Sequence, residues 1–201
     1  LVVTGMALYD TCTDGLALDT TSPEKVGKVQ GIMVAARAVG VVVISIMIGL
    51  ISQSSGWESV FNGLAVITLI PLPLILIYRE PEKPEGITFN WQSFRVFTRK
   101  SVIAVGLLGA LFTAITNGTN QLVNPFLKEN FGISLLSAGF YTALWGVGVI
   151  TGGISGGLLA DRFGHRKAIL GALFTALVSV SLLSMITGPL IAWPLLFLFG
   201  I

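Results

Sequence analysis

Three ionisable residues lie inside apolar stretches near the start of the chain. Asp10 and Asp14 are four residues apart, which places both carboxylates on one face of a helix. If that helix ends near Thr20, Asp10 lies about 15 Å and Asp14 about 9 Å from the boundary of the apolar layer. Arg37 lies about six residues into the next apolar stretch, at a depth similar to that of Asp14. The spacing therefore predicts an Asp14–Arg37 ion pair that leaves Asp10 without a local cation.

A carboxyl group in this position is suited to taking up a proton. Desolvation and a neighbouring like charge both favour the protonated form of a carboxyl group. Asp10 is therefore the candidate proton site, with Asp14 and Arg37 as its charge network. The alternative interpretation is a structural network of Asp and Arg side chains that holds two helices together.

A second polar feature follows one face of a later apolar stretch. Asn117, Asn120, Gln121 and Asn124 recur at helical spacing, and Thr113 lies one turn earlier on the same face. Such a stripe would be costly against lipid, so it is expected to face the protein interior or a watery cavity. Alternatively, its outer end near Asn124 is simply exposed to water.

The composition excludes several classes of protein. The chain has 201 residues, of which 53% are hydrophobic and 11% are charged, and its mean hydropathy is +0.86. These values exclude an ordinary soluble domain and a disordered chain. Cys12 has no disulfide partner, and the net charge of +2 does not suggest a nucleic-acid binder. The sequence shows no metal-ligand cluster, phosphate-binding loop or nucleophile elbow. We therefore expect that the protein binds no metal or cofactor and is not an enzyme.

The remaining class is an all-α, multi-pass membrane protein. A membrane helix needs about 20 apolar residues, and the stretches that fit or partly fit are 1–18, 31–53, 58–78, 101–124, 134–160, 168–187 and 190–201. The chain begins and ends inside apolar runs, so we expect an internal fragment. Pro71 and Pro73 predict a kink in the third stretch, and Ser134 is placed to cap the fifth.

Basic residues predict the orientation of these helices. The second, fourth and sixth connections contain only Lys128, whereas the first, third and fifth contain Lys25, Lys28, Arg79, Lys83, Arg95, Arg99, Lys100, Arg162, Arg166 and Lys167. Because cytoplasmic loops are enriched in Lys and Arg, loops 20–30, 79–100 and 161–167 are predicted to be cytoplasmic, in a plasma or inner membrane.

The longest of these loops, residues 79–100, divides the helices into two groups. Its first part is polar and contains prolines, as a linker does. Its second part places Trp91, Phe94 and Phe97 among basic residues, which predicts a short helix lying in the membrane interface. The alternative is a flexible tether.

A motif with fixed spacing lies between the fifth and sixth stretches. Residues 157–167 have the form G-x-x-x-D-R-x-G-x-R-K, in which the matching positions are Gly157, Asp161, Arg162, Gly164, Arg166 and Lys167. This segment resembles the cytoplasmic signature loop of the major facilitator superfamily. Gly152, Gly153, Gly156 and Gly157 would form one small-residue face for close helix packing, and Gly164 would allow the reversal into the next helix. The alternative is a merely basic cytoplasmic hairpin.

The resemblance implies a fold of two pseudo-symmetric helical halves, here truncated at both ends. The seven stretches would be helices four to ten, with residues 1–78 in the N-terminal half, 79–100 in the loop between the halves and 101–201 in the C-terminal half. In that family the signature loop bridges two helices and stabilises one of two alternating conformations. The first helix of the second half lines the central cavity, which implies that Thr113, Asn117, Asn120 and Gln121 contact substrate.

A shorter resemblance covers about thirty residues near the start. Asp10, Asp14 and Asp19, followed by P-E-K-V-G and an arginine on the next helix, resemble the muropeptide permease branch and its acyl-coenzyme A and folate transporter relatives. Val26 stands where those proteins commonly carry arginine. The resemblance implies proton coupling and leaves the substrate open.

Together these features predict a secondary active transporter whose partners are a small organic solute, protons and the lipid bilayer. Proton coupling would make it a symporter. The alternative is a membrane scaffold or assembly factor that has the same fold and does not transport, because a fold does not fix a function.

Overall fold

The computed structural model describes residues 2–22, 25–79 and 91–201, and it is helical throughout these ranges with short connections. The described residues contain no strand, so the predicted all-α fold is confirmed. The elements are α1 (Val2–Asp19), α2 (Val26–Leu69), α3 (Pro71–Ile77), η2 (Trp91–Thr98), α4 (Lys100–Phe131), α5 (Leu135–Phe163), α6 (His165–Leu183), η3 (Pro189–Ile191) and α7 (Ala192–Gly200).

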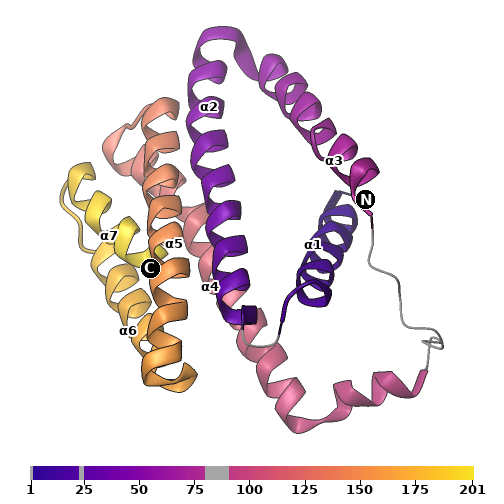
Figure 1. Ribbon diagram of the computed structural model, residues 1–201. Coiled ribbons are helices and arrows are strands. Elements are labelled where there is room, and N and C mark those ends of the chain that lie inside the picture. The colour runs from indigo at the N-terminus through magenta and orange to yellow at the C-terminus, as the bar shows by residue number, and fades with distance from the viewer. Residues whose placement is uncertain (1, 23–24, 80–90) are drawn as a thin grey trace.

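Four described segments are long and apolar enough to cross a membrane: Val26–Ile77, Lys100–Phe131, Leu135–Ala160 and His165–Leu183. The first of these contains two of the predicted spans. Its helical backbone is interrupted at Gly56, and Figure 1 shows the ribbon turning back at the top of α2. Gly56 has φ +78° and ψ 175°, a backbone conformation that is essentially restricted to glycine. A single glycine therefore makes the turn between two antiparallel passes.

The predicted interruption at the prolines is also present. Helix α2 ends at Leu69, and α3 begins at Pro71, the first of the two prolines. Ile70 between them keeps helical angles of φ −58° and ψ −39°. Because proline lacks a backbone donor, the helical hydrogen-bond ladder is broken here while the chain continues onward.

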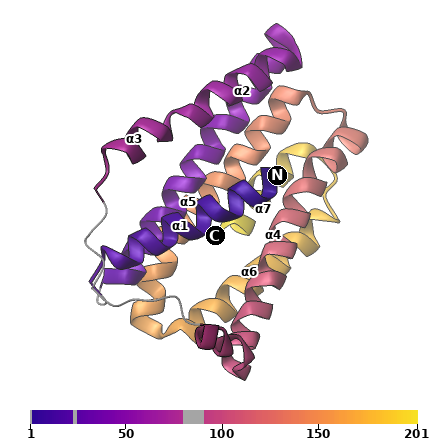
Figure 2. The ribbon, with the colours of Figure 1, turned by 90° about the vertical axis from the view of Figure 1, so that its right-hand side faces the viewer.

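The connections that are rich in Lys and Arg gather at one end of the molecule. Figures 1 and 2 place the end of α1, the start of α2, η2 and the α5–α6 turn at the lower end, opposite the turn within α2 and the α4–α5 connection. This sharing of one end is what the orientation prediction requires. Which side of a membrane that end occupies stays a prediction.

The opposite end holds the apolar core, where α4, α5, α6 and α7 meet. Tyr141 anchors it, because its hydroxyl donates to the carbonyl of Pro189 at 2.9 Å while its ring meets Trp193 edge to face at 6.1 Å. Ser134 caps α5 as predicted, accepting the backbone N–H of Ser137 at 3.2 Å. The buried members of this core are Val123, Leu127, Tyr141, Leu183, Ala192, Leu195 and Leu196.

Helices α2 and α5 pack closely along an antiparallel seam of small residues. Three glycines of α5 that are seven residues apart lie in this seam: Gly139, Gly146 and Gly153. A Cβ atom added at Gly139 would lie 2.5 Å from the carbonyl oxygen of Ser45, and one added at Gly31 would lie 2.9 Å from that of Gly153. The two backbones are therefore too close for side chains at these points, as in other membrane helix pairs with small-residue interfaces.

The predicted single face of four glycines at the end of α5 is wrong. Gly153 lies against α2, whereas Gly152 lies against Ile201 at the end of α7. A Cβ added at Gly156 would have no neighbour within 4 Å among the described atoms, and one at Gly157 would be 4.0 Å from the carbonyl oxygen of Gly27. Adjacent residues point about 100° apart on a helix, so the glycines serve two faces of α5, one toward α2 and one toward α7.

Candidate functional site

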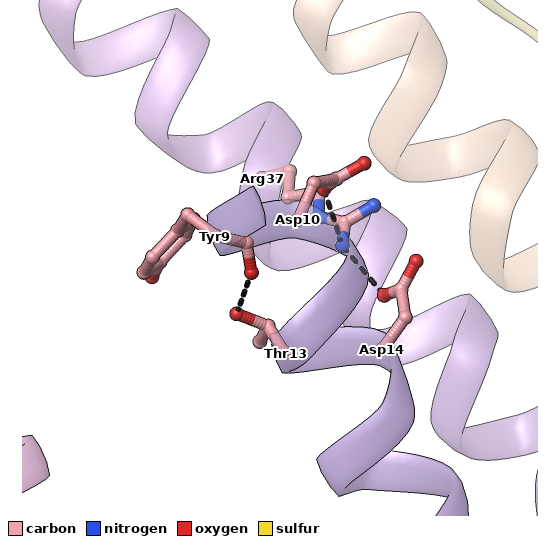
Figure 3. A network of polar contacts seen from close by, with 5 residues as sticks. All are labelled: Tyr9, Asp10, Thr13, Asp14 and Arg37. Carbon is pink, nitrogen blue, oxygen red and sulfur yellow. Dashed lines mark hydrogen bonds and ion pairs between the residues drawn. The ribbon is translucent and has the colours of Figure 1, made fainter. Parts of the chain in front are cut away.

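A charge network connects α1 to α2. The Nη2 atom of Arg37 donates a hydrogen bond to Oδ1 of Asp14 at 2.6 Å and forms an ion pair with Oδ1 of Asp10 at 2.8 Å. Figure 3 shows both carboxylates pointing from one face of α1 toward the guanidinium, which comes from α2. On the next face, the Thr13 hydroxyl donates to the carbonyl of Tyr9 at 2.6 Å, so it is satisfied within its own helix.

The network corrects one part of the sequence-based expectation. The predicted Asp14–Arg37 pair is present, but the prediction that Asp10 lacks a cation is wrong. The reason is geometric: a spacing of four residues places both carboxylates on the same side of α1, and the long arginine side chain reaches both with one nitrogen atom. Arg37 therefore shares its single positive charge between two negative ones.

The network is open on one side within the described chain. The exposed fractions of the side chains are 58% for Asp10, 44% for Arg37 and 35% for Asp14. The Nε and Nη1 atoms of Arg37 make no hydrogen bond with any described residue. A guanidinium presents five N–H donors in a planar fork, so an edge of Arg37 remains that can bind a carboxylate or another acceptor.

The polar stripe on α4 divides into two parts. Asn124 at its outer end donates from Nδ2 to the hydroxyl of Thr142 at 2.9 Å and so joins α4 to α5. The hydrogen-bonding groups of the other stripe members have no partner among the described residues; these members are Thr113, Asn117, Asn120 and Gln121. In the part of the chain that the structure describes, no hydrogen bond or ion pair joins the stripe to the charge network.

The signature loop is a turn made at a single residue. Gly164 ends α5 and begins α6, with φ +88° and ψ 146°, which fits the predicted role of this glycine in the reversal. The Arg162 guanidinium lies 5.4 Å from the ring centre of Phe163, and Arg166 and Lys167 are exposed. The side chain of Asp161 lies outside the described residues, so its predicted contacts stay predictions.

Two features of this region went unpredicted. The α2–α5 seam has a sequence signal, because small residues recur every seven positions on both helices: Gly31, Ala38 and Ser45 on one, and Gly139, Gly146 and Gly153 on the other. The Asn124–Thr142 bond has no such signal, because it depends on how α4 and α5 pack. Among the described residues no group of three or more His, Cys, Asp and Glu side chains could hold a metal ion.

Sequence comparison finds relatives of this chain that are named as transporters. Over 187 residues the chain is 24% identical to the sialic acid transporter NanX of Escherichia coli (strain K12), covering 89% of this chain and 45% of that protein. Over 171 residues it is 28% identical to the uncharacterized MFS-type transporter YbcL of Bacillus subtilis (strain 168), covering 79% of this chain and 42% of that protein. The matched region is therefore less than half the length of either relative.

No solved structure matches the chain. The family model of the Major Facilitator Superfamily, in contrast, matches residues 1–201. The match includes the charge network, the polar stripe and the signature loop. The chain therefore belongs to the Major Facilitator Superfamily.

Proposed function

We propose that the chain is part of a secondary transporter that moves a small organic solute across the membrane by alternating access, coupled to protons. The observation that carries this proposal is the sharing of Arg37 between Asp10 and Asp14. Two carboxylates and one guanidinium leave one net negative charge between two apolar helices. Ionisable groups in such helices are costly and are characteristic of substrate and proton pathways.

One proton neutralises this network. Asp10 is the proposed site for it, because its more exposed side chain is the easier of the two for a proton to reach and its contact with Arg37 is the longer of the two. Protonation of Asp10 leaves Arg37 paired with Asp14 alone, which frees part of the guanidinium. A proton and a solute that binds the freed edge then enter the site together, as symport requires.

The polar groups favour a hydrogen-bonding solute with an acidic group. The unpartnered amides and hydroxyl of the α4 stripe suit a solute rich in hydroxyl or amide groups, and the free edge of Arg37 suits a carboxylate. One relative is named a sialic acid transporter, so sialic acid is the first solute to test.

The test of coupling is uptake into proteoliposomes that contain the full-length protein, driven by an imposed pH gradient. Asp10→Asn is expected to abolish gradient-driven accumulation while solute exchange continues, because asparagine keeps the shape of the side chain and cannot carry the proton. Glu129→Gln is the matched control, since Glu129 is an exposed carboxylate of α4 and has no ion pair with a described residue. Asp10→Asn with the wild-type pH dependence would disprove the coupling role.

The test of the solute site uses the stripe. Asn117→Ala and Asn120→Ala are each expected to raise KM for the solute about two- to tenfold, because each removes a hydrogen-bonding group from the proposed site. Asn130→Ala is the control, since the amide of Asn130 donates to the carbonyl of Phe126 within α4. Unchanged KM in both stripe variants would show that the stripe does not contact solute.

The same proposal assigns each part of the chain to one half of the transporter or to the loop between the halves. Residues 1–78 are helices of the N-terminal half, 79–100 the cytoplasmic loop between the halves, and 101–201 the first helices of the C-terminal half, in a plasma or inner membrane. On this assignment the seam between α2 and α5 joins the two halves, which supports a role in their relative movement. The signature loop at Gly164 then lies on the cytoplasmic side, where it stabilises one conformation.

A further inference from the structure

The segment η2 arranges its aromatic rings in one row. It is a 3-10 helix with three residues per turn, so residues three apart lie directly above one another. The ring centres of Trp91 and Phe94 are 5.6 Å apart, and those of Phe94 and Phe97 are 5.9 Å apart. The exposed fractions of the three residues are 77%, 49% and 65%. The row therefore presents a continuous apolar edge about two turns long.

Basic residues accompany this row without acidic ones. Residues 91–100 contain Arg95, Arg99 and Lys100 and no Asp or Glu. All three basic residues are exposed, and none forms an ion pair with a described residue. The segment thus combines a local apolar edge with three positive charges that lack counter-ions in the described chain.

η2 lies directly before a helix that is long and apolar enough to cross a membrane. Arg99 is extended, with φ −71° and ψ 129°, and separates η2 from α4, one of the helices able to cross a membrane. Figure 1 shows η2 leaving the foot of α4 sideways instead of continuing its line, at the end where the other basic connections lie. A short amphipathic segment at the foot of a spanning helix lies at the depth of the lipid headgroups.

We propose that residues 91–100 bind anionic phospholipid in the leaflet at this end of the bundle. The rings of Trp91, Phe94 and Phe97 lie at the boundary between headgroups and acyl chains. Arg95, Arg99 and Lys100 bind the headgroup phosphates, which supply the missing counter-ions. Such an anchor holds the first turn of α4 at the membrane surface. This role is independent of the proposed solute and proton chemistry.

The first experiment is native mass spectrometry of the full-length protein with added phosphatidylglycerol or phosphatidylcholine. We expect wild type to retain phosphatidylglycerol in preference to phosphatidylcholine. In the double variant Arg95→Gln/Arg99→Gln, the ratio of bound phosphatidylglycerol to bound phosphatidylcholine is expected to fall about tenfold. Lys25→Gln/Lys28→Gln is the matched control, because it removes two exposed positive charges at the start of α2, which lies at the same end of the molecule as η2. Equal lipid preference in wild type and in the Arg95/Arg99 variant would overturn the proposal.

The second experiment places the rings in vesicles that contain phosphatidylglycerol. The difference in fluorescence between wild type and Trp91→Phe isolates the emission of Trp91. We expect brominated phosphatidylglycerol to quench this emission and aqueous iodide to leave it nearly unchanged. Strong quenching by iodide without quenching by the brominated lipid would show a segment in water, as a tether or a protein-binding site would be, and would overturn the proposal.

Discussion

Gly139→Ala is expected to destabilise the protein by separating α2 from α5. The added methyl group would lie 2.5 Å from the carbonyl oxygen of Ser45 and 3.7 Å from the Cα of Ile46, whereas ordinary contact begins at 3.4 Å. The helices must therefore move apart locally by roughly 0.9 Å, the difference between 3.4 Å and 2.5 Å. The obstacle is backbone, so no side-chain rotation can relieve it.

The magnitude follows from the packing that is lost. A gap of 0.5–1 Å forfeits about a quarter to a half of each dispersion contact that it opens, and overpacking of a tight interface typically costs about 1–3 kcal/mol. Alanine also raises helix propensity by about 1 kcal/mol relative to glycine, which offsets part of this cost. We therefore expect a net loss of up to about 2 kcal/mol, from the difference of these two effects.

The assay is thermal unfolding of the full-length protein in detergent. Gly40→Ala is the matched control, because Gly40 is an exposed residue of α2 and an added Cβ would have no described atom within 4 Å. The control is expected to keep or slightly raise Tm, since only the gain in helix propensity remains. Equal Tm values for the two variants would refute the close approach of α2 and α5 at Gly139.

Three further changes are expected to lower Tm in the same assay. Gly56→Ala forces a methyl group into a glycine-only conformation at a cost of about 1–3 kcal/mol. Gly63→Ala, inside a regular helix, is not expected to lower Tm, and equal Tm values for the two variants would contradict the glycine-only conformation at Gly56. Ser134→Ala removes the cap of α5 and costs about 1 kcal/mol, and Ser134→Asp should restore Tm if capping is the cause. Tyr141→Phe removes the hydroxyl that donates to the Pro189 carbonyl, which keeps the backbone N–H of Ala192 as a second donor, and costs about 1 kcal/mol. The exposed Tyr9→Phe should show no loss, and equal Tm changes in both variants would argue against the Tyr141–Pro189 hydrogen bond.

The helices could be predicted from the sequence because membrane helices are defined by long local patterns. Five of the seven predicted apolar stretches lie in segments long and apolar enough to cross a membrane; the stretches 1–18 and 190–201 do not. The interruption at the prolines 71 and 73 and the cap at Ser134 are also readable without a partner helix, and both are present. The sequence predicted a connection between two apolar stretches but not the turn at Gly56, because a glycine in a sequence does not by itself indicate a positive φ.

The candidate site could be predicted only in part. The Asp14–Arg37 pair followed from depth in two adjacent helices, but depth alone could not show that Arg37 also reaches Asp10. The glycines of α5 were recognised as packing residues, yet their division between α2 and α7 depends on which helices pack on either side. Contacts between helices are set by tertiary packing, which a single local pattern does not encode.

The most direct test of the account is whether the full-length protein binds a solute. Thermal unfolding is measured with a panel of sugar acids, sugars, peptidoglycan fragments and other metabolites, for wild type and for Asp10→Asn. A solute at 100 times its Kd stabilises the folded state by about 2.7 kcal/mol. The account predicts selective stabilisation by one chemical class, with a pH dependence that Asp10→Asn removes. A well-folded protein that no solute stabilises would contradict the account and favour a non-transporting scaffold with the same fold.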